Sequence, residues 1–253
     1  MSSKAVILAG GTGSRLAPYT TVLPKPLMPI GDRAILDVIV RQLAAYGFTD
    51  LKFAVGYLGH LIKAVFGDGS AHGVSIEYLD EPEPLGTAGP LRQLGEVDET
   101  LLVMNGDLLT NVDYREFLEL HRKSRNAMTI ATHRRVVHVN YGVLNVAGTA
   151  REVDVVTGYD EKPELPYIVS MGVYALEPRA IDVIPEGRFD IPDLVLRLLE
   201  VGEPVGSYLF DGYWLDIGRH DDYQQALDDY EEVLPKLLPS SSATSLRADS
   251  KLE

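Results

Sequence analysis

The stretch that decides the fold is residues 5–15, Ala-Val-Ile-Leu-Ala-Gly-Gly-Thr-Gly-Ser-Arg, where a short apolar run passes directly into a glycine-rich turn. A short apolar run bounded by glycine predicts a buried β-strand. After it, Gly10, Gly11 and Gly13 lack side chains, so backbone N–H groups can approach a ligand, and Arg15 adds positive charge. The pattern favours a nucleotide site at the end of a first strand.

Two common nucleotide fingerprints do not account for this turn. A dinucleotide motif would need a third glycine where the sequence has Leu16, and no G-x-x-x-x-G-K-[ST] phosphate loop occurs. A second loop, residues 23–29, holds Lys25 between two prolines, which fixes the backbone and presents one cation. Taken alone, the turn could be only a tight turn and the lysine only a solvated side chain. Their occurrence close together favours phosphate binding.

Around these loops, short β-branched runs alternate with helical patterns, as in a parallel sheet flanked by helices. The alternating segments are residues 5–9, 35–46, 51–55, 58–66, 74–79 and 101–104. Later strand-like runs have fewer helices between them, which predicts an antiparallel subregion laid onto the first sheet. These runs are residues 128–132, 141–146, 168–176 and 205–210. We therefore expect an α/β fold with a mixed, mostly parallel sheet, closed by an amphipathic helix at residues 219–234.

Length and composition suit one large domain. With 253 residues and 45% hydrophobic content, we expect a single domain over residues 1–238. Residues 239–253 lack periodicity and are expected to be a disordered tail or an appended remnant. The apolar run at residues 5–9 is too short for a signal peptide or membrane span. We expect a soluble protein without a membrane partner.

Charge and cysteine content narrow the function classes. The formal net charge of −14 would repel a polynucleotide, so no nucleic acid partner is expected. The absence of cysteine excludes disulfides, thiolate metal sites and a cysteine nucleophile, and it suits a reducing cytoplasm. The six histidines show no metal-ligand spacing, and Ser14 lacks a recognisable His and Asp partner. Small-molecule phosphate substrates remain the expected partners.

Several motifs together carry a resemblance to a known family. They are L-A-G-G-T-G-S-R-L at 8–16, P-K-P-L-M-P-I at 24–30, E-P-E-P-L-G-T-A-G at 81–89, N-G-D at 105–107, Y-G at 141–142, E-K-P at 161–163 and G-Y-W-L-D-I-G at 212–218. In order and spacing this set resembles the sugar-1-phosphate nucleotidyltransferases over residues 4 to about 230. Within that family it looks closest to mannose-1-phosphate guanylyltransferase-like members. Each motif alone would be weak.

The resemblance implies a nucleotide-diphosphosugar transferase fold, with a Rossmann-like half for the nucleotide and a second half for the sugar phosphate. By position, Arg15 would bind the departing pyrophosphate and Lys25 the α-phosphate under attack. Asp107 and Asp216 would hold Mg²⁺. Many relatives carry a C-terminal left-handed β-helix or a second domain, and this chain is expected to end too early for either.

The same resemblance implies the substrate contacts. Glu161 and Lys162 would engage the sugar phosphate, with Lys162 countering its charge. The sugar pocket would be lined by Gly142, Ser170 and Gly172. The nucleotide would contact Leu8, Ala9, Gly10, Gly11, Thr12, Gly13, Glu81, Gly86 and Thr87.

Elementary chemistry is consistent with these roles. Attack of one phosphate on another requires neutralised repulsion, an in-line approach and charge stabilisation on the leaving pyrophosphate. Mg²⁺ commonly takes only one or two protein carboxylates, so two separated aspartates suffice. Asp107 follows the apolar run 101–104, at the carboxyl end of an expected strand, where ligand sites lie in open α/β sheets. Asn-Gly-Asp is also ordinary turn chemistry, and Glu161-Lys162 is also an ordinary surface pair.

The base and the sugar are less constrained. A carboxylate at Glu81 would pair with the two donors of guanine, N1–H and N2–H₂, which favours GTP, although Glu83 is an alternative and both could be solvated. Thymidylyl transfer or another base specificity is the alternative reading. Mannose, glucose, heptose and cyclitol phosphates all remain open, as does a homo-oligomer. A glycosyltransferase on a related fold and an inactive regulatory homologue are the rival classes.

Overall fold

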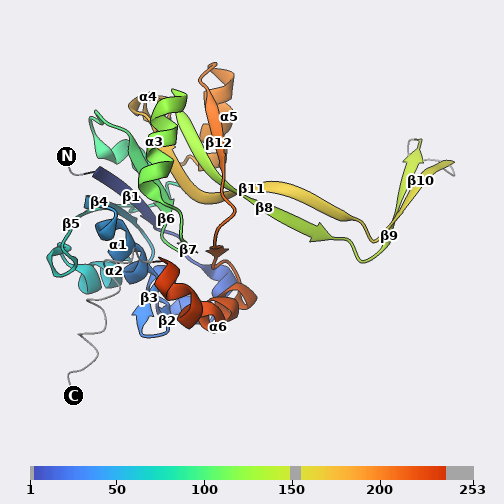
Figure 1. Ribbon diagram of the computed structural model, residues 1–253. Helices are drawn as coiled ribbons and strands as arrows, with labels where there is room; N and C mark the ends of the chain where they lie inside the picture. The colour runs from blue at the N-terminus through green and yellow to red at the C-terminus, as the bar shows by residue number, and fades with distance from the viewer. Residues whose placement is uncertain (1–2, 149–154, 238–253) are drawn as a thin grey trace.

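The computed structural model describes residues 3–148 and 155–237, and its centre is one seven-stranded sheet (Figure 1). In spatial order the strands are β12 (Val205–Leu209), β8 (Met128–His138), β11 (Glu164–Leu176), β6 (Leu101–Asn105), β1 (Ser3–Ala9), β4 (Phe48–Val55) and β5 (Ser75–Asp80). Strands β6, β1, β4 and β5 are parallel, and β11 runs antiparallel to both β6 and β8. The mixed, mostly parallel sheet predicted from the sequence is confirmed.

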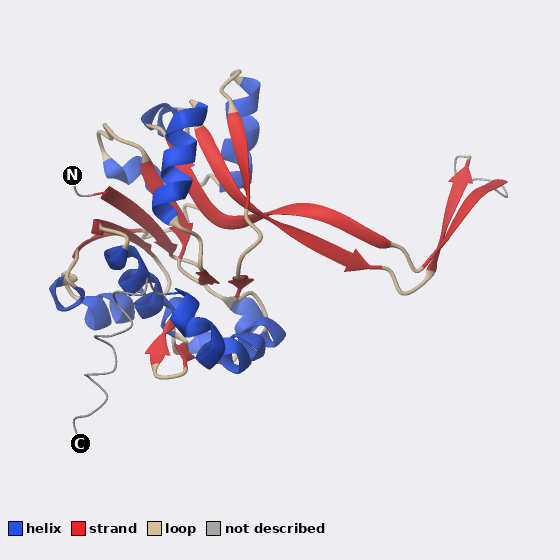
Figure 2. Cartoon of the chain, in the orientation of Figure 1, coloured by secondary structure: helices blue, strands red, loops and turns tan. Residues whose placement is uncertain are grey.

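Helices cover both faces of this sheet (Figure 2). They are α1 (Ile35–Ala45), α2 (Gly59–Phe66), α3 (Tyr114–Ser124), α4 (Pro178–Asp182), α5 (Ile191–Glu200) and α6 (His220–Leu237). Alternate residues of β1 enter two separate cores: Ala5 and Ile7 pack with α1, α2, α3 and α6, whereas Val6 packs with α4 and α5. A strand buried on both faces reads as a continuous apolar run, which is what residues 5–9 show.

Local sequence accounts for where several helices begin and end. In α1, Ile35, Val38 and Leu43 lie on one buried stripe, and the helix ends two residues before Gly47, whose φ is +87°. Helix α3 begins after Asp113, whose carboxylate accepts from the backbone N–H of Arg115 at 2.9 Å. The expected closing helix at 219–234 is α6, and the expected tail from residue 239 lies outside the described residues.

The strands β8 and β11 continue beyond the sheet as a two-stranded ribbon (Figure 1). At its far end lie β9 (Gly142–Ala147) and β10 (Val155–Glu161), which pair with each other as a separate two-stranded sheet. Residues 141–146 therefore form a strand as expected, but this strand is not laid onto the central sheet. We call described residues 133–148 and 155–169 the arm. Two further short pairings, of β2 (Pro29–Ile30) with β3 (Arg33–Ala34) and of β7 (Leu108–Thr110) with β13 (Trp214–Asp216), are too short to show a sequence periodicity.

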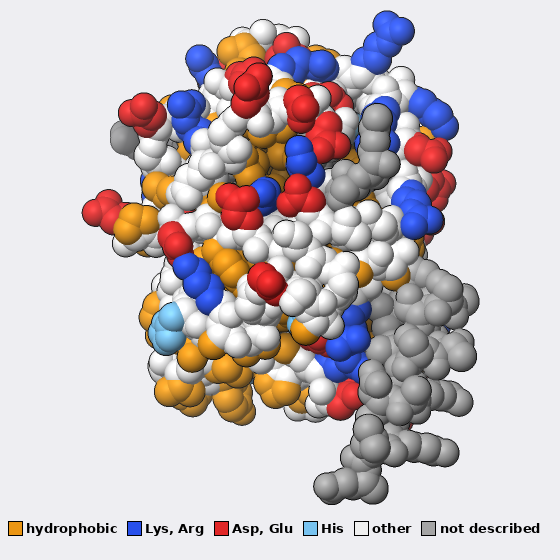
Figure 3. Space-filling view, turned by 90° about the vertical axis from the view of Figure 1, so that its left-hand side faces the viewer, with side chains coloured by type: hydrophobic (Ala, Val, Ile, Leu, Met, Phe, Trp, Pro, Cys, Tyr) orange, Lys and Arg blue, Asp and Glu red, His pale blue; other side chains and the backbone are white. Residues whose placement is uncertain are grey.

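The charged surface and the character of the helices concern two partners discussed above, nucleic acid and membrane. On the face shown in Figure 3, Lys and Arg side chains are scattered among Asp and Glu rather than joined in one basic band. Within the described residues, no helix combines the length and the apolar character needed to cross a membrane.

A buried histidine links α3 to the sheet. His121 has Nδ1 2.7 Å from the hydroxyl of Thr129 and Nε2 3.1 Å from a carboxylate oxygen of Glu177, which also accepts from Thr100. Burial lowers the pKa of His121, against the opposing effect of Glu177. The side chain is therefore a structural, neutral imidazole, in agreement with its place on the apolar stripe of the helix.

This histidine should make stability depend on pH. Because the folded-state pKa lies below the unfolded value of about 6.5, the unfolded chain binds more protons as the pH falls below that value. The contribution of neutral His121 to the free energy of unfolding is fully present above pH 6.5. It is lost as the pH falls toward the folded-state pKa of this histidine. Urea unfolding at pH 7.5 and 5.5 should show a larger loss of unfolding free energy for the wild type than for His121→Gln. Equal losses in the two proteins would contradict the assignment.

Candidate active site

The predicted phosphate-binding loops and Asp107 meet at the carboxyl edge of the parallel strands. Strands β1 and β6 pair in register with Leu8 opposite Asn105, and the N–H of Gly106 donates to the carbonyl of Leu8 at 2.9 Å. The glycine-rich turn and the Asn-Gly-Asp turn therefore leave the sheet side by side. This edge is where open α/β sheets bind ligands.

A buried lysine lies between two aspartates at this edge. Lys25, only 7% exposed, has Nζ 2.5 Å from Oδ2 of Asp107 and 4.0 Å from Oδ1 of Asp216. The two carboxylates, distant in sequence, converge because β7 and β13 pair with Leu108 opposite Asp216. The N–H of Ile217 also donates to the carbonyl of Asp107 at 3.2 Å. We call Lys25, Asp107 and Asp216 the charged cluster.

The electrostatics of the charged cluster suit a cation. Burial raises the pKa of Asp216, the neighbouring carboxylate of Asp107 raises it further, and Lys25 and Arg15 oppose the shift. Oδ1 of Asp107 is buried without a hydrogen-bond partner. Such an orphaned acceptor is costly unless something occupies it. Across the described ranges no group of three or more His, Cys, Asp or Glu could hold a metal. Two carboxylates with one unpaired oxygen fit Mg²⁺, whose shell is usually completed by water and phosphates.

Two adjoining hollows surround the charged cluster. The larger, about 510 Å³, is lined by Leu8, Gly10, Gly11, Thr12, Gly56, Tyr57, Glu81, Pro82, Pro84, Gly86, Thr87, Asn105 and Asp107. The smaller, about 230 Å³, is lined by Leu8, Ala9, Gly11, Gly13, Ser14, Arg15, Lys25, Pro26 and Asp107. Every residue predicted to contact the nucleotide lines one of the two, and Arg15 and Lys25 both line the smaller.

Glu81 projects into the larger hollow beside the glycine-rich turn. One carboxylate oxygen accepts from the N–H of Leu85 at 3.0 Å. A Cβ atom added at Gly10 would lie 2.4 Å from the other oxygen, so Gly10 leaves the space that the carboxylate fills. Burial raises the pKa of Glu81. Glu83 is exposed and does not line the hollow, so of the two acids left open by the sequence, Glu81 is the one that lines this hollow.

Gly86 and Thr87 are held by the start of α5. Asp190, the N-cap of α5, accepts from the N–H of Thr87 at 2.9 Å, and the hydroxyl of Thr87 accepts from the N–H of Ile191 at 2.8 Å. Gly86 has φ +78°, and a Cβ there would lie 2.6 Å from the carbonyl oxygen of Phe189. This wall of the hollow is therefore built from segments about a hundred residues apart in sequence.

The predicted sugar-phosphate residues divide into two groups. Ser170 and Gly172 lie near the charged cluster: Gly172, with φ +76°, packs against Asn105, and Ser170 Oγ donates to the hydroxyl of Tyr174 at 3.2 Å. Burial raises the pKa of Tyr174, and Asp107 and Asp216 add to the shift. The register of β11 against β8 shifts between Ser170 and Tyr174, the segment that contains Gly172.

Gly142, Glu161 and Lys162 lie on the arm instead (Figure 1). The ring of Tyr159 covers Gly142, so that a Cβ there would lie 2.0 Å from the phenol oxygen. The side chains of Glu161 and Lys162 are 60% and 66% exposed. A single chain in this conformation does not bring these three residues to the charged cluster.

Sequence reasoning missed part of the larger hollow. Gly56, Tyr57, Pro82, Pro84 and Asn105 line it but were not predicted. Gly56 and Tyr57 follow β4, the parallel neighbour of β1, so their place at the same edge was the available signal. Asn105 belongs to the Asn-Gly-Asp motif, in which only the aspartate suggested chemistry.

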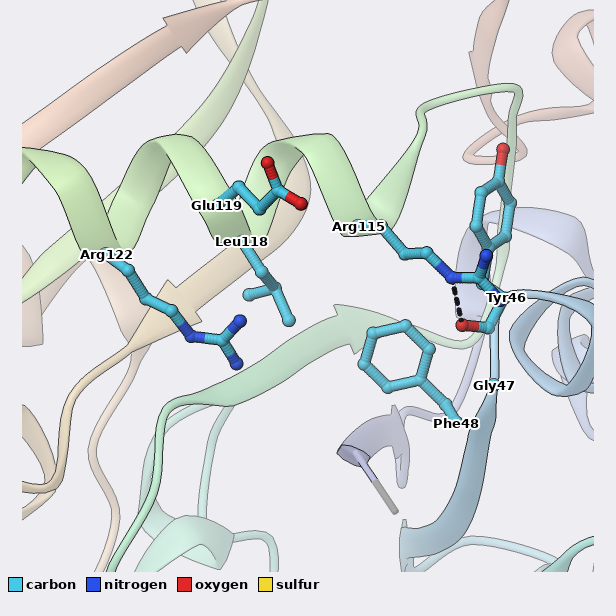
Figure 4. Close-up of a pocket in the computed structure, with 7 residues that line it drawn as sticks. All are labelled: Tyr46, Gly47, Phe48, Arg115, Leu118, Glu119 and Arg122. Carbon is cyan, nitrogen blue, oxygen red and sulfur yellow. Dashed lines mark hydrogen bonds between the residues drawn. The ribbon is translucent and has the colours of Figure 1, made fainter. Parts of the chain in front are cut away.

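A further hollow of about 310 Å³ lies at the opposite, amino-terminal end of β4 (Figure 4). Arg115 and Arg122 of α3 line it together with Tyr46 and Phe48. The guanidinium of Arg115 donates to the carbonyl of Tyr46 at 2.8 Å, directly after α1. This arginine caps the last carbonyls of a helix, so we assign the hollow no substrate.

Known proteins resemble this chain along most of its length. The uridylyltransferase for UTP and glucose 1-phosphate of Synechocystis is 32% identical over 245 residues, covering 88% of this chain and 62% of that protein. Mannose-1-phosphate guanylyltransferase of Mycobacterium tuberculosis is 34% identical over 227 residues, covering 87% and 62%. The chain thus spans less than two thirds of each relative. The crystal structure of HddC from Yersinia pseudotuberculosis has a TM-score of 0.70 at 23% identity, covering 90% of this chain and 99% of that one, which shows a shared fold.

The family follows from the extent of one further match. Residues 4–233 match the model of the nucleotidyl transferase family, and this range includes the glycine-rich turn, the charged cluster and both hollows. On this match and on the fold, the chain belongs to the nucleotidyl transferase family.

Proposed function

We propose that the chain transfers a nucleoside monophosphate from an NTP to a sugar 1-phosphate, with release of pyrophosphate. The observation that carries the proposal is the charged cluster of Lys25, Asp107 and Asp216 at the mouth of the glycine-lined hollows. The named activities of both relatives, a uridylyltransferase and a guanylyltransferase, support it.

The residues of the smaller hollow have separable roles in this reaction. Lys25, held in place by two carboxylates, stabilises charge on the α-phosphate under attack. Arg15 is exposed and lines the same hollow, where it binds the departing pyrophosphate. The attacking phosphate oxygen is already ionised, so the direct in-line displacement needs no strong general base.

We also propose that Asp107 and Asp216 hold Mg²⁺. The unpaired Oδ1 of Asp107 and the proximity of the two carboxylates support this assignment. When bound, the ion would neutralise charge on the phosphates that complete its shell. Asp216 belongs to β13, and Asp107 directly precedes β7. The pairing of β7 with β13 therefore holds the two carboxylates close to each other.

A substrate matrix tests the reaction class. GTP, dTTP, UTP, CTP and ATP are each mixed with mannose, glucose, heptose and cyclitol phosphates, and pyrophosphate release is measured. At least one pair should give sustained release that depends on both substrates. A glycosyltransferase would instead consume an NDP-sugar and release no pyrophosphate from these mixtures. Absence of release from every pair would refute the proposal.

We propose guanine as the base, and the position of Glu81 in the larger hollow supports this choice. The acceptor-only carboxylate of Glu81 matches a base edge with two adjacent donors, which guanine alone among the five bases presents. Thymine and uracil offer one donor beside acceptors, and adenine places an acceptor against the carboxylate. A wrong base would leave a half-buried carboxylate unpaired, and such mismatches discriminate strongly.

Glu81→Gln should therefore weaken the preference for GTP. Gln keeps the size of Glu81 beside Gly10 but replaces one acceptor by a donor, so kcat/KM for GTP should fall by about ten-fold or more relative to the other NTPs. The matched control is Glu83→Gln, which alters an exposed acid of the same loop and should leave the preference unchanged. A wild type that prefers dTTP or UTP would refute the guanine assignment.

A further inference from the structure

The single tryptophan of the chain lies beside the charged cluster. Trp214 precedes Asp216 by two residues in β13, and side chains two apart along a strand project to the same side. Leu215, between them, is 3% exposed and packs in the core, so Trp214 and Asp216 share the other side of the strand. The indole N–H donates to the carbonyl of Met171 at 3.0 Å. The tryptophan therefore also touches the segment 170–172, whose two ends are predicted to line the sugar pocket.

An arginine at the base of the arm lies over this tryptophan. The guanidinium carbon of Arg135 is 4.9 Å from the centre of the Trp214 ring, which is a cation–π distance. His133, two residues earlier and on the same side of β8, is tilted against the same ring with 5.5 Å between ring centres. Nδ1 of His133 lies 2.8 Å from the carbonyl oxygen of Phe210. These contacts hold a long and otherwise flexible side chain in one place.

The donors of this guanidinium are free. Among the residues that the structure describes, none forms a hydrogen bond or an ion pair with Arg135. Arg41 and Arg179, in contrast, each have a carboxylate partner at 2.8 Å. An arginine that is held by an aromatic face rather than by a carboxylate keeps its N–H groups for an incoming anion, and the planar fork matches a phosphate group.

Arg135 lies on the side of the charged cluster away from the nucleotide hollows. Segments that follow β1, β4 and β5 line those hollows, β6 leads to Asp107, and β11 and β8 come next across the sheet. Both β6 and β8 run antiparallel to β11, so Arg135 leaves the sheet at the same carboxyl edge as Asp107. Two strand spacings of about 4.8 Å separate β8 from β6. Neither Trp214 nor Arg135 lines a nucleotide hollow.

The proposed displacement needs charge on both sides of the α-phosphorus. The attacking oxygen approaches in line with the departing pyrophosphate, from the other side of the phosphorus. Arg15 lines the smaller hollow and, together with Arg219, another hollow of about 360 Å³, so the pyrophosphate side has two guanidiniums. Arg135 places a third on the side of β11 and β8, where the acceptor enters.

We propose that Arg135, held on the face of Trp214, binds the phosphate group of the acceptor. The ligand is a phosphate monoester whose sugar lies toward the segment 170–172. A guanidinium in this place offsets the repulsion between the acceptor phosphate and the triphosphate as they approach each other. The cation belongs to the same chain as the charged cluster and comes from the base of the arm. This assignment rests on the proposed function.

Fluorescence tests the binding without reference to activity, because Trp214 is the only tryptophan. An anion on Arg135 alters the cation over the indole, so emission should change saturably on titration with the sugar phosphates of the substrate matrix or with inorganic phosphate. Each titration is made with Mg²⁺, with and without an α,β-methylene NTP analogue. Arg135→Gln should weaken the apparent affinity by about ten-fold or more, the usual effect of losing a hydrogen bond to a charged group.

The matched control is Arg134→Gln. It removes the neighbouring arginine, which is also exposed but projects to the other side of β8, and it should leave the affinity unchanged. Equal affinities for the wild type and Arg135→Gln would overturn the proposal. So would the absence of any saturable change in the wild type.

Steady-state kinetics separates binding from a structural role. In Arg135→Gln, KM for the sugar phosphate should rise by about ten-fold or more while KM for the NTP stays unchanged, and Arg135→Lys should recover part of the loss because it keeps the charge. An unchanged KM for the sugar phosphate in active Arg135→Gln would overturn this inference and leave the proposed function standing. If the wild type releases no pyrophosphate from any pair, the proposed function fails, and the fluorescence titration still decides whether Arg135 binds phosphate.

Discussion

Lys25→Ala is expected to lower kcat for pyrophosphate release by about 10²- to 10³-fold, the usual effect of removing one preorganised charge from a transition state. The ammonium is buried and fixed by Asp107 and Asp216, so solvent cannot take over its role. Arginine should not restore full activity, because its planar guanidinium does not fit the place of a compact ammonium.

The control for this variant is Lys52→Ala, which removes a lysine paired with Glu77 on the sheet away from both nucleotide-lining hollows. Its turnover should equal that of the wild type. Circular dichroism of Lys25→Ala checks folding, since its removal leaves two carboxylates facing each other without a cation. Wild-type pyrophosphate release from folded Lys25→Ala would remove this lysine from the mechanism.

Asp107→Asn is expected to reduce turnover at least as severely and to raise the Mg²⁺ concentration needed for half-maximal activity. The substitution keeps the shape of the side chain but removes the charge that offers the unpaired Oδ1 to a cation. Asp216→Asn should act in the same direction. Chelation of divalent ions should abolish wild-type activity, and added Mg²⁺ should restore it.

Asp211→Asn supplies the matched comparison, because Asp211 is an exposed aspartate five positions before Asp216. Its Mg²⁺ dependence should be that of the wild type. An unchanged Mg²⁺ requirement in Asp107→Asn, with folding preserved, would show that the carboxylate does not hold the metal.

Local sequence predicted the nucleotide half of the molecule well. Residues 5–9 lie in β1 and residues 35–46 correspond to α1, because a short apolar run that ends at glycines and a helical apolar stripe are both local signals. The position of Asp107 at a strand's carboxyl end followed from the apolar run before it. These inferences use contacts between near neighbours in the chain, or the general geometry of parallel sheets.

The rest depended on long-range pairing. Asp216 reaches Asp107 through the three-residue strands β7 and β13, which are too short for a periodic signal. Residues 141–146 have the apolar, β-branched content of a strand, but that content does not say which strand pairs with them. For that reason the sequence placed this strand on the central sheet, whereas the structure places it on the arm.

The contact between Gly10 and Glu81 bears on redesign of base specificity. The carboxylate occupies the volume that any side chain at position 10 would need, so these two positions form one steric unit. If position 81 alone is varied, a side chain that extends further toward residue 10 than glutamate does would collide with the backbone of Gly10. If position 10 alone is varied, any side chain there would displace the carboxylate of Glu81, the group proposed to recognise the base. Engineered variants that accept a different nucleotide should therefore arise from paired changes at 10 and 81, and related sequences should show the same coupling.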